Sequence, residues 1–238
     1  ILAFSLLCAN LAFAQGATVA VAANMKETFT EIATAFKSTG KPEMRVVYGS
    51  SGNLAAQIIN GAPFNLLIAA DEHFPLELYK KGKAVDKGVI YAAGKLALIA
   101  KTNSGIVLVD NKAELAKMIA KANKVAIAKP ELAPYGKAAV QYLKSEGLWD
   151  LAKDKLVYGD NIGVATTYVV TGAAEMGFTA LSLAKSPEVT KDTNYILLNP
   201  KLYEPIRQRM VLIKGAPQEA KDLYQFMQGV QARAILTK

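Results

Sequence analysis

The sequence has 238 residues, of which 52% are apolar and 20% charged, a composition typical of folded chains and not of disordered ones. This length allows one large domain or two small ones, and a single His and a single Cys are too few for a zinc site or a disulfide. With 28 Lys and Arg against 20 Asp and Glu, the net charge is +8, which first indicates nucleic acid or an anionic surface as a partner.

Residues 1–14 have the features of a secretory signal peptide. They carry no charge and end in Ala12-Phe13-Ala14, an A-x-A cleavage pattern after a short apolar run. A membrane anchor is disfavoured because about 14 residues are too few to span a bilayer. A lipid anchor at Cys8 is disfavoured because Leu7 is larger than the residue that lipidation requires. We therefore expect a partial signal peptide over residues 1–14 and a periplasmic protein.

Short β-rich segments then alternate with amphipathic helical segments. Residues 17–22 (ATVAVA) predict a buried strand, and residues 25–36 carry apolar side chains at helical spacing. The further expected elements are strand 45–48, helix 54–59, strand 66–70, helix 73–81, strand 95–100, helix 112–120, strand 124–128, helix 136–145, strand 156–158, helix 162–170, strands 177–181 and 210–213, and a helix from about Pro217. This alternation predicts an α/β architecture with largely parallel sheets.

Polar or Gly-rich segments near residues 91–94 and 202–205 predict two connections between two lobes of similar size. Two connections return the C-terminal segment to the lobe in which the chain began. We therefore expect lobe 1 to comprise residues 15–92 and 203–238, and lobe 2 to comprise residues 93–202.

Four strand-to-helix junctions carry the candidate ligand residues. In parallel α/β sheets such junctions gather at one edge, where ligands bind. Each helix N-terminus offers free backbone N–H groups and a partial positive charge, so several together make an anion site without Lys or Arg. The junction residues are Ala23 and Asn24, Ser50 and Ser51, Tyr135, and Asn161 and Ile162. Taken singly, a residue such as Asn24, Ser51 or Asn161 is also explained as the cap of its own helix.

In several segments the sequence resembles the periplasmic molybdate-binding proteins of ABC uptake systems. The segments are 18–24 (TVAVAAN), 48–58 (YGSSGNLAAQI), 61–71 (GAPFNLLIAAD), 128–136 (AKPELAPYG), 148–150 (LWD), 160–162 (DNI) and 177–178 (GF). The resemblance implies a type II periplasmic binding protein fold, with two α/β lobes and a ligand cleft between them. It also implies capture of a tetrahedral oxyanion, molybdate or tungstate, and its delivery to an ABC permease in the inner membrane.

The same resemblance assigns the ligand positions. The family's hydroxyl ligand falls on Ser51, and its ligand at the first helix start, usually Ser, falls on Asn24. Backbone N–H donors are expected from Ser51, Tyr135 and Ile162. Many members carry a Tyr hydroxyl where this sequence has Ala180, and many have Ala where it has Tyr135. The Tyr135 phenol is therefore a candidate donor from the other side of the anion, and a partly buried packing role is its alternative.

The carried-over positions contain no charged residue, although Asp160 lies next to Asn161. Phosphate near neutral pH keeps a proton and needs an acceptor, whereas molybdate, tungstate and sulfate need donors only, so such a site disfavours phosphate. If Asp160 points inward, this exclusion weakens. Molybdate and tungstate are nearly equal in size, and we expect both to bind. A protein of the same fold for sulfate or thiosulfate is the alternative.

Two other classes fit less well. The segment Gly49-Ser50-Ser51-Gly52-Asn53 departs from the G-x-S-x-G motif of hydrolases at Asn53, and the single histidine, His73, lies in a charged helical segment. The lysines are scattered and lack the interleaved aromatic residues of a nucleic-acid platform. We therefore expect a monomeric binding protein that is not an enzyme, has no cofactor and does not bind nucleic acid.

Overall fold

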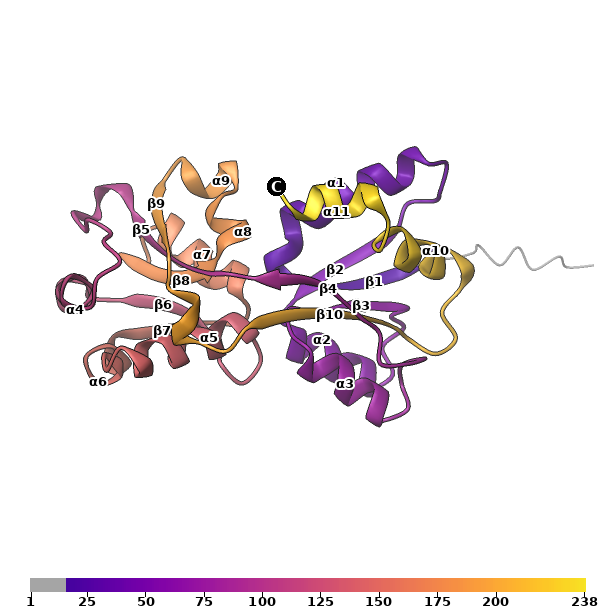
Figure 1. Cartoon of the computed structure of the whole chain (residues 1–238), viewed down its shortest axis with the longest axis horizontal. Coiled ribbons are helices and arrows are strands. Elements are labelled where there is room, and N and C mark those ends of the chain that lie inside the picture. The colour runs from indigo at the N-terminus through magenta and orange to yellow at the C-terminus, as the bar shows by residue number, and fades with distance from the viewer. Residues whose placement is uncertain (1–15) are drawn as a thin grey trace, which may run out of the picture.

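The computed structural model describes residues 16–238 and shows two α/β lobes side by side (Figure 1). Each lobe is built on one five-stranded sheet with helices packed against it. The two-lobed α/β fold expected from the sequence is confirmed. The signal-peptide prediction, with Cys8, lies outside the described residues.

The first sheet has the strand order β2-β1-β3-β10-β4. Its strands are β1 (Thr18–Ala22), β2 (Arg45–Gly49), β3 (Leu66–Ile68), β4 (Val89–Gly94) and β10 (Ile206–Leu212). Strand β1 pairs in parallel with β2 and β3, whereas β10 runs antiparallel to β3 and β4. Its helices are η1 (Ala23–Met25), α1 (Lys26–Ser38), α2 (Ser51–Ile59), α3 (His73–Lys80), α10 (Gln218–Phe226) and α11 (Val230–Leu236).

The second sheet has the order β7-β6-β8-β5-β9. Its strands are β5 (Leu96–Lys101), β6 (Val125–Ala128), β7 (Leu156–Gly159), β8 (Met176–Ala180) and β9 (Thr193–Leu197). Strand β6 is parallel to β7 and β8, and β5 is antiparallel to β8 and β9. The helices are η2 (Thr102–Ser104), α4 (Lys112–Lys121), α5 (Pro134–Ser145), α6 (Trp149–Ala152), η3 (Lys153–Lys155), α7 (Ile162–Val170), α8 (Leu181–Ala184), α9 (Pro187–Thr190) and η4 (Pro200–Leu202).

The chain passes between the two sheets twice, from β4 into β5 at residue 95 and from β9 to β10 over residues 198–205. Both passages lie near the middle of the long axis (Figure 1). Because β10 returns to the first sheet, the C-terminal helices belong to the lobe that contains β1.

Three features of this topology differ from the sequence prediction. Strands β4 and β9 were not expected, and β10 begins at Ile206 and not at residue 210. Both β4 and β9 are edge strands with mostly partly exposed or exposed residues. The β4 segment (VIYAAG) is apolar, but residues 91–94 were expected to form a connection between the lobes, and β9 (TNYIL) begins with two polar residues. Helices α2 and α5 also begin two or three residues earlier than expected, because their first turns hold polar, Pro or Gly residues that show no helical periodicity.

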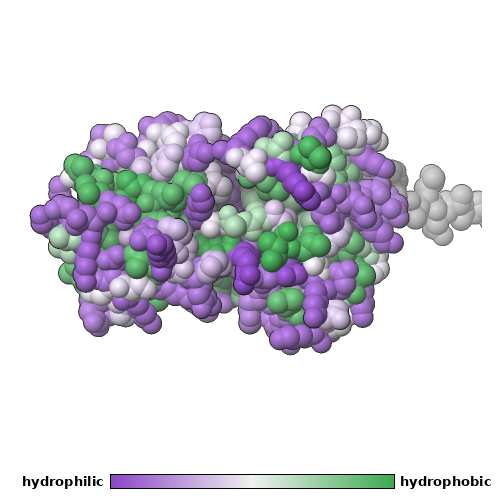
Figure 2. All heavy atoms as spheres, viewed as in Figure 1, coloured by the Kyte–Doolittle hydropathy of each residue, from purple (hydrophilic) through white to green (hydrophobic). Residues whose placement is uncertain are grey.

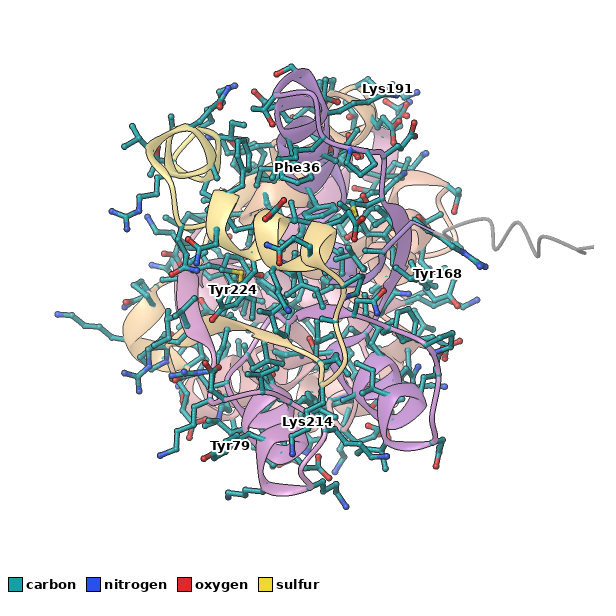
Figure 3. All side chains as sticks on the ribbon, turned by 90° about the vertical axis from the view of Figure 1, so that its right-hand side faces the viewer. Phe36, Tyr79, Tyr168, Lys191, Lys214 and Tyr224 are labelled. Atoms are coloured by element: carbon teal, nitrogen blue, oxygen red, sulfur yellow. The ribbon has the colours of Figure 1, made fainter. Side chains whose placement is uncertain are left out.

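Apolar side chains of both lobes form the core. In the first lobe, α1 and α11 cover one face of the sheet and α2 and α3 the other (Figure 1). The Phe36 ring of α1 meets the Phe226 ring of α10 edge-on at 5.4 Å, and Figure 3 shows this end of the molecule with Phe36 and Tyr224 labelled. Hydrophilic residues are spread over both lobes, and apolar residues reach the surface in separate patches (Figure 2). No helix within residues 16–238 is long and apolar enough to span a bilayer.

Gly136, in the first turn of α5, fixes how closely this helix approaches the end of β6. A Cβ atom at Gly136 would lie 2.1 Å from the carbonyl oxygen of Ala128. We expect Gly136→Ala to lower the free energy of unfolding by about 1–3 kcal/mol, as overpacking of a core does. Urea denaturation followed by circular dichroism measures this change. Gly229→Ala, whose new Cβ meets only the Phe226 carbonyl oxygen at 3.2 Å, is the matched control, and an equal loss in both variants would contradict the argument.

Candidate functional site

The first ligand candidates lie at the N-terminus of α2. Ser50 is the N-cap, and its Oγ accepts a hydrogen bond from the Asn53 N–H at 3.4 Å. Ser51 is 1% exposed, and its Oγ accepts from the Ala70 N–H at 2.9 Å. Because Ala70 uses a lone pair of this oxygen, the Ser51 hydroxyl keeps its own proton for donation. The Ser51 hydroxyl can therefore donate a hydrogen bond to an acceptor such as an oxyanion.

Asn24 occupies the short helix η1 directly after β1. Its side-chain Nδ2 donates to Gln208 Oε1 at 3.1 Å, and its backbone carbonyl accepts from Ser182 Oγ at 2.8 Å. The residue is 2% exposed, and its Oδ1 has no hydrogen-bond partner among the described residues. A buried amide oxygen without a partner is costly, which marks this position as unusual.

The second lobe contributes Tyr135 and the N-terminus of α7. The Tyr135 side chain is buried, and its Oη accepts from Gln208 Nε2 at 3.1 Å. Burial raises the pKa of the Tyr135 phenol, so the hydroxyl stays protonated. Asn161 is the N-cap of α7, with its Oδ1 accepting from the Val164 N–H at 3.1 Å, and Ile162 follows with 4% exposure.

The two lobes meet at these junctions. The Gly52 N–H of α2 donates to the Leu132 carbonyl at 2.9 Å, and a Cβ at Gly52 would lie 3.0 Å from that oxygen. Ala22, Ala23 and Ala70 of the first lobe belong to the same apolar core as the second sheet. The lobes are therefore closed on each other.

The structure brings the predicted residues into two groups. Asn24 and Tyr135 meet through Gln208, and Ser51 joins them through the Ala69–Ala70 peptide. Ala23 and Asn161 line a separate cavity of about 290 Å³ between the lobes, together with Tyr48. Ser50 is used as a helix cap, and within residues 16–238 its side chain makes no hydrogen bond to the other candidates.

Gln208 and Tyr91 are the functional candidates that the sequence did not reveal. Gln208 lies between two arginines in β10 and is 3% exposed, and Tyr91 lies in β4, a strand that was not expected. An alternation of polar and apolar residues in a strand does not single out one Gln from its neighbours. Only the pairing of β4 with β10 makes their roles visible.

The hydrogen bonds that join Asn24, Tyr135 and Gln208, and the bond from Ala70 to Ser51, involve no charged side chain. Asp160, next to Asn161 in sequence, forms an ion pair with Lys129 at 2.6 Å, and its side chain is 67% exposed. Its carboxylate therefore lies at the protein surface and is paired with a lysine. His73 is exposed on α3, and no cluster of three or more His, Cys, Asp or Glu side chains within residues 16–238 is arranged to hold a metal ion.

Asp71 is the carboxylate with the most unusual environment. It follows β3 and lines an interlobe cavity of about 310 Å³ with Pro134 and Lys137 of α5. Desolvation by burial raises the pKa of Asp71 to about 6, although the Phe74 N–H and the positive charges of His73 and Lys137 oppose the shift. Ionised Asp71 is therefore unfavourable in the folded, closed form.

Comparisons with known proteins give a consistent result. Residues 17–238 match the model of a family described as bacterial extracellular solute-binding proteins. The molybdate-binding protein ModA of Azotobacter vinelandii is 37% identical over 92% of this chain and 86% of its own length. ModA of Rhodobacter capsulatus is 34% identical over 92% of this chain and 85% of its own. The solved periplasmic molybdate-binding protein of Azotobacter vinelandii superposes with a TM-score of 0.82 at 34% identity, covering 93% of this chain and 96% of that one.

The raised pKa of Asp71 predicts a pH-dependent stability. Below its unfolded value of 3.8 the carboxyl is protonated in both states, and as the pH rises through about 6 the folded state loses stability because it must accept a buried charge. We expect Asp71→Asn to gain about 2–3 kcal/mol in unfolding free energy relative to the wild type between pH 4 and pH 7. Urea denaturation at both pH values measures this. Asp154→Asn, at an exposed carboxylate, is the control, and a difference for Asp71→Asn that stays constant with pH would contradict the prediction.

Proposed function

This chain belongs to the bacterial extracellular solute-binding proteins, and from this premise we propose that it binds molybdate, and also tungstate, and delivers the anion to an ABC permease. It is not an enzyme, since proteins of this family bind a solute and pass it on. We further propose that it acts as a monomer in the periplasm after removal of a signal peptide, and that the permease lies in the inner membrane.

The observation that carries the proposal is the burial of uncharged donor residues from both lobes, of which Asn24, Tyr135 and Ser51 belong to one chain of hydrogen bonds. Ser51 offers a hydroxyl proton at a helix N-terminus, Tyr135 and Ile162 offer the first turns of α5 and α7, and Asn24 offers a side-chain amide. Hydrogen bonds to a charged group contribute about 1.5–3 kcal/mol each, so several suffice to hold a small dianion. Similarity to molybdate-binding proteins over more than nine-tenths of the chain supports the choice of anion.

Selection among oxyanions follows from donors and size. The outward-facing Asp160 leaves no carboxylate among the candidate residues to accept the proton of a phosphate. Molybdate and tungstate carry the same charge and nearly the same radius, so donor geometry gives no basis to separate them. Sulfate is smaller, and a closed site built for the larger anions leaves its hydrogen bonds too long.

Calorimetric titration of the protein with molybdate, tungstate, sulfate and phosphate tests this function. We expect molybdate and tungstate to bind with similar micromolar or tighter affinity, and sulfate at least tenfold more weakly. Phosphate is expected to show no heat of binding. Binding of phosphate alone, or of none of the four anions, would refute the proposal, and a preference for sulfate would support a receptor of the same fold for another oxyanion.

The role of Ser51 is tested by Ser51→Ala. The substitution removes a donor to the anion and leaves the buried Ala70 N–H without its acceptor. We expect molybdate affinity to fall about 10- to 150-fold, the equivalent of one hydrogen bond to a charged group. Ser38→Ala, at an exposed hydroxyl that bonds only the Ala35 carbonyl, is the matched control and should bind as the wild type does. Equal affinity of Ser51→Ala and the wild type would show that the assigned site is wrong.

A further inference from the structure

Gln208 is a buried amide that contacts the candidate ligand residues of both lobes. Its Oε1 lies 3.1 Å from Asn24 Nδ2 and 2.9 Å from Tyr91 Oη, and its Nε2 lies 3.1 Å from Tyr135 Oη. The β4–β10 register shifts next to Gln208, which pairs with Ala92 while Arg209 pairs with Ile90. Tyr91 is the extra residue of this bulge, and bulges redirect side chains in this way.

Gly94 makes room for this arrangement. A Cβ at Gly94 would lie 2.2 Å from Tyr135 Oη and 2.6 Å from Gln208 Nε2. The close contact between the tyrosine of the second lobe and the glutamine of the first therefore depends on the absence of a side chain at this position.

The hydrogen bonds continue from Gln208 to Ser51. Tyr91 Oη lies 2.9 Å from the Ala69 carbonyl oxygen, and the N–H of the same peptide group, on Ala70, donates to Ser51 Oγ at 2.9 Å. One chain of hydrogen bonds thus joins Ser51, Asn24 and Tyr135, although they come from three different helix starts.

In the present direction of its hydrogen bonds, this network leaves two groups unsatisfied. Tyr91 has a single proton but lies 2.9 Å from two acceptors, the Ala69 carbonyl and Gln208 Oε1. Asn24 Oδ1 is buried without a partner among the described residues. Both conflicts have the same origin, since Gln208 presents its oxygen to Asn24 and Tyr91.

Reversal of both amides removes both conflicts. Gln208 Nε2 then donates its two protons to Tyr91 Oη and Asn24 Oδ1, and Tyr91 donates to Ala69. Gln208 Oε1 accepts the proton of Tyr135. Asn24 Nδ2 then takes the place of the unpartnered oxygen and becomes a donor without an acceptor in the described part of the protein, which is the group that a bound oxyanion requires.

We propose that Gln208 is a positioning residue that sets the direction of this network, and that the oxyanion selects the reversed direction, in which Asn24 Nδ2 donates to it. This inference rests on the proposed function. The Tyr135 hydroxyl is then bonded to Gln208 and does not reach the anion, so Tyr135 contributes its backbone N–H. The anion selects this direction of the hydrogen-bond network because it stabilises only the arrangement in which Asn24 offers it a donor.

Two near-isosteric variants separate hydrogen bonding from packing. Gln208→Glu keeps the shape but, when ionised, only accepts, so it holds Asn24 Oδ1 toward the anion. Gln208→Met fills the same space but neither donates nor accepts a strong hydrogen bond. At pH 7.5 we expect molybdate affinity to fall at least 100-fold in Gln208→Glu and about 10- to 100-fold in Gln208→Met. Gln57→Glu, at an exposed position of α2, is the control for added charge and should change affinity less than threefold.

The pH dependence supplies the readout that packing does not move. In Gln208→Glu the introduced carboxyl, once protonated, can donate its single proton to Asn24 Oδ1 and accept from Tyr135 through its carbonyl oxygen, which restores the bond to Asn24 but not the one to Tyr91. We compare each variant's molybdate affinity with that of the wild type at the same pH. For Gln208→Glu this relative affinity should rise at least tenfold between pH 7.5 and pH 5.5 and then exceed that of Gln208→Met. For Gln208→Met the relative affinity should not change with pH. The proposal would be overturned if both variants bound molybdate as tightly as the wild type at pH 7.5. It would also be overturned if Gln208→Glu bound molybdate more weakly than Gln208→Met at pH 5.5.

The direction of the Asn24 amide is observed by ¹⁵N-edited NMR, with the side-chain NH₂ signals assigned by their loss in Asn24→Asp. Saturation with molybdate should shift one Nδ2 proton of Asn24 downfield in the wild type and not in Gln208→Glu at pH 7.5. If the wild-type protein binds molybdate and this signal does not move, the network proposal is wrong and the proposed function stands. If the wild type binds none of the tested oxyanions, both are wrong.

Discussion

The contact between the strand-to-helix junctions of the two lobes is the constraint on which the rest of the structure depends. Helix α2 reaches the second lobe through a backbone hydrogen bond from Gly52 to Leu132, and η1 reaches it through the Asn24 carbonyl and Ser182. Helix N-termini repel each other electrostatically when they converge. A dianion between them would offset that repulsion, so we expect anion binding to stabilise the closed arrangement of the lobes.

The proposed site would recognise a charged ligand without charged side chains. The excess of eight positive charges lies elsewhere, and ion pairs such as Lys129–Asp160 and Lys137–Glu204 occupy exposed positions. Exposed charges act through a field that salt screens, which raises the rate of encounter with a dianion but contributes little to holding it. Dipoles and amides fixed by a closed fold do the holding, because they need no reorganisation when the anion arrives.

Two titratable groups near the cleft have raised pKa values for the same reason. The Asp71 carboxyl and the Tyr135 phenol are both buried, and desolvation disfavours their charged forms. Asp71 lies at the rim of a cavity and is shifted into the range of natural pH, whereas Tyr135 is simply kept neutral. Burial thus makes a negative charge on either side chain more costly in the folded protein.

The sequence by itself determined the α/β architecture, most helices and strands, and the junctions at Asn24, Ser51, Tyr135 and Ile162, because caps, apolar runs and helical periodicity are local patterns. Strands β4 and β9 and the roles of Gln208 and Tyr91 emerged only from the folded arrangement. The apolar segment of β4 could equally be a connection, and only its pairing with β10 shows that it is a strand. The bond between Asn24 and Gln208 joins residues 184 positions apart and depends on a strand bulge, a register that no local pattern specifies.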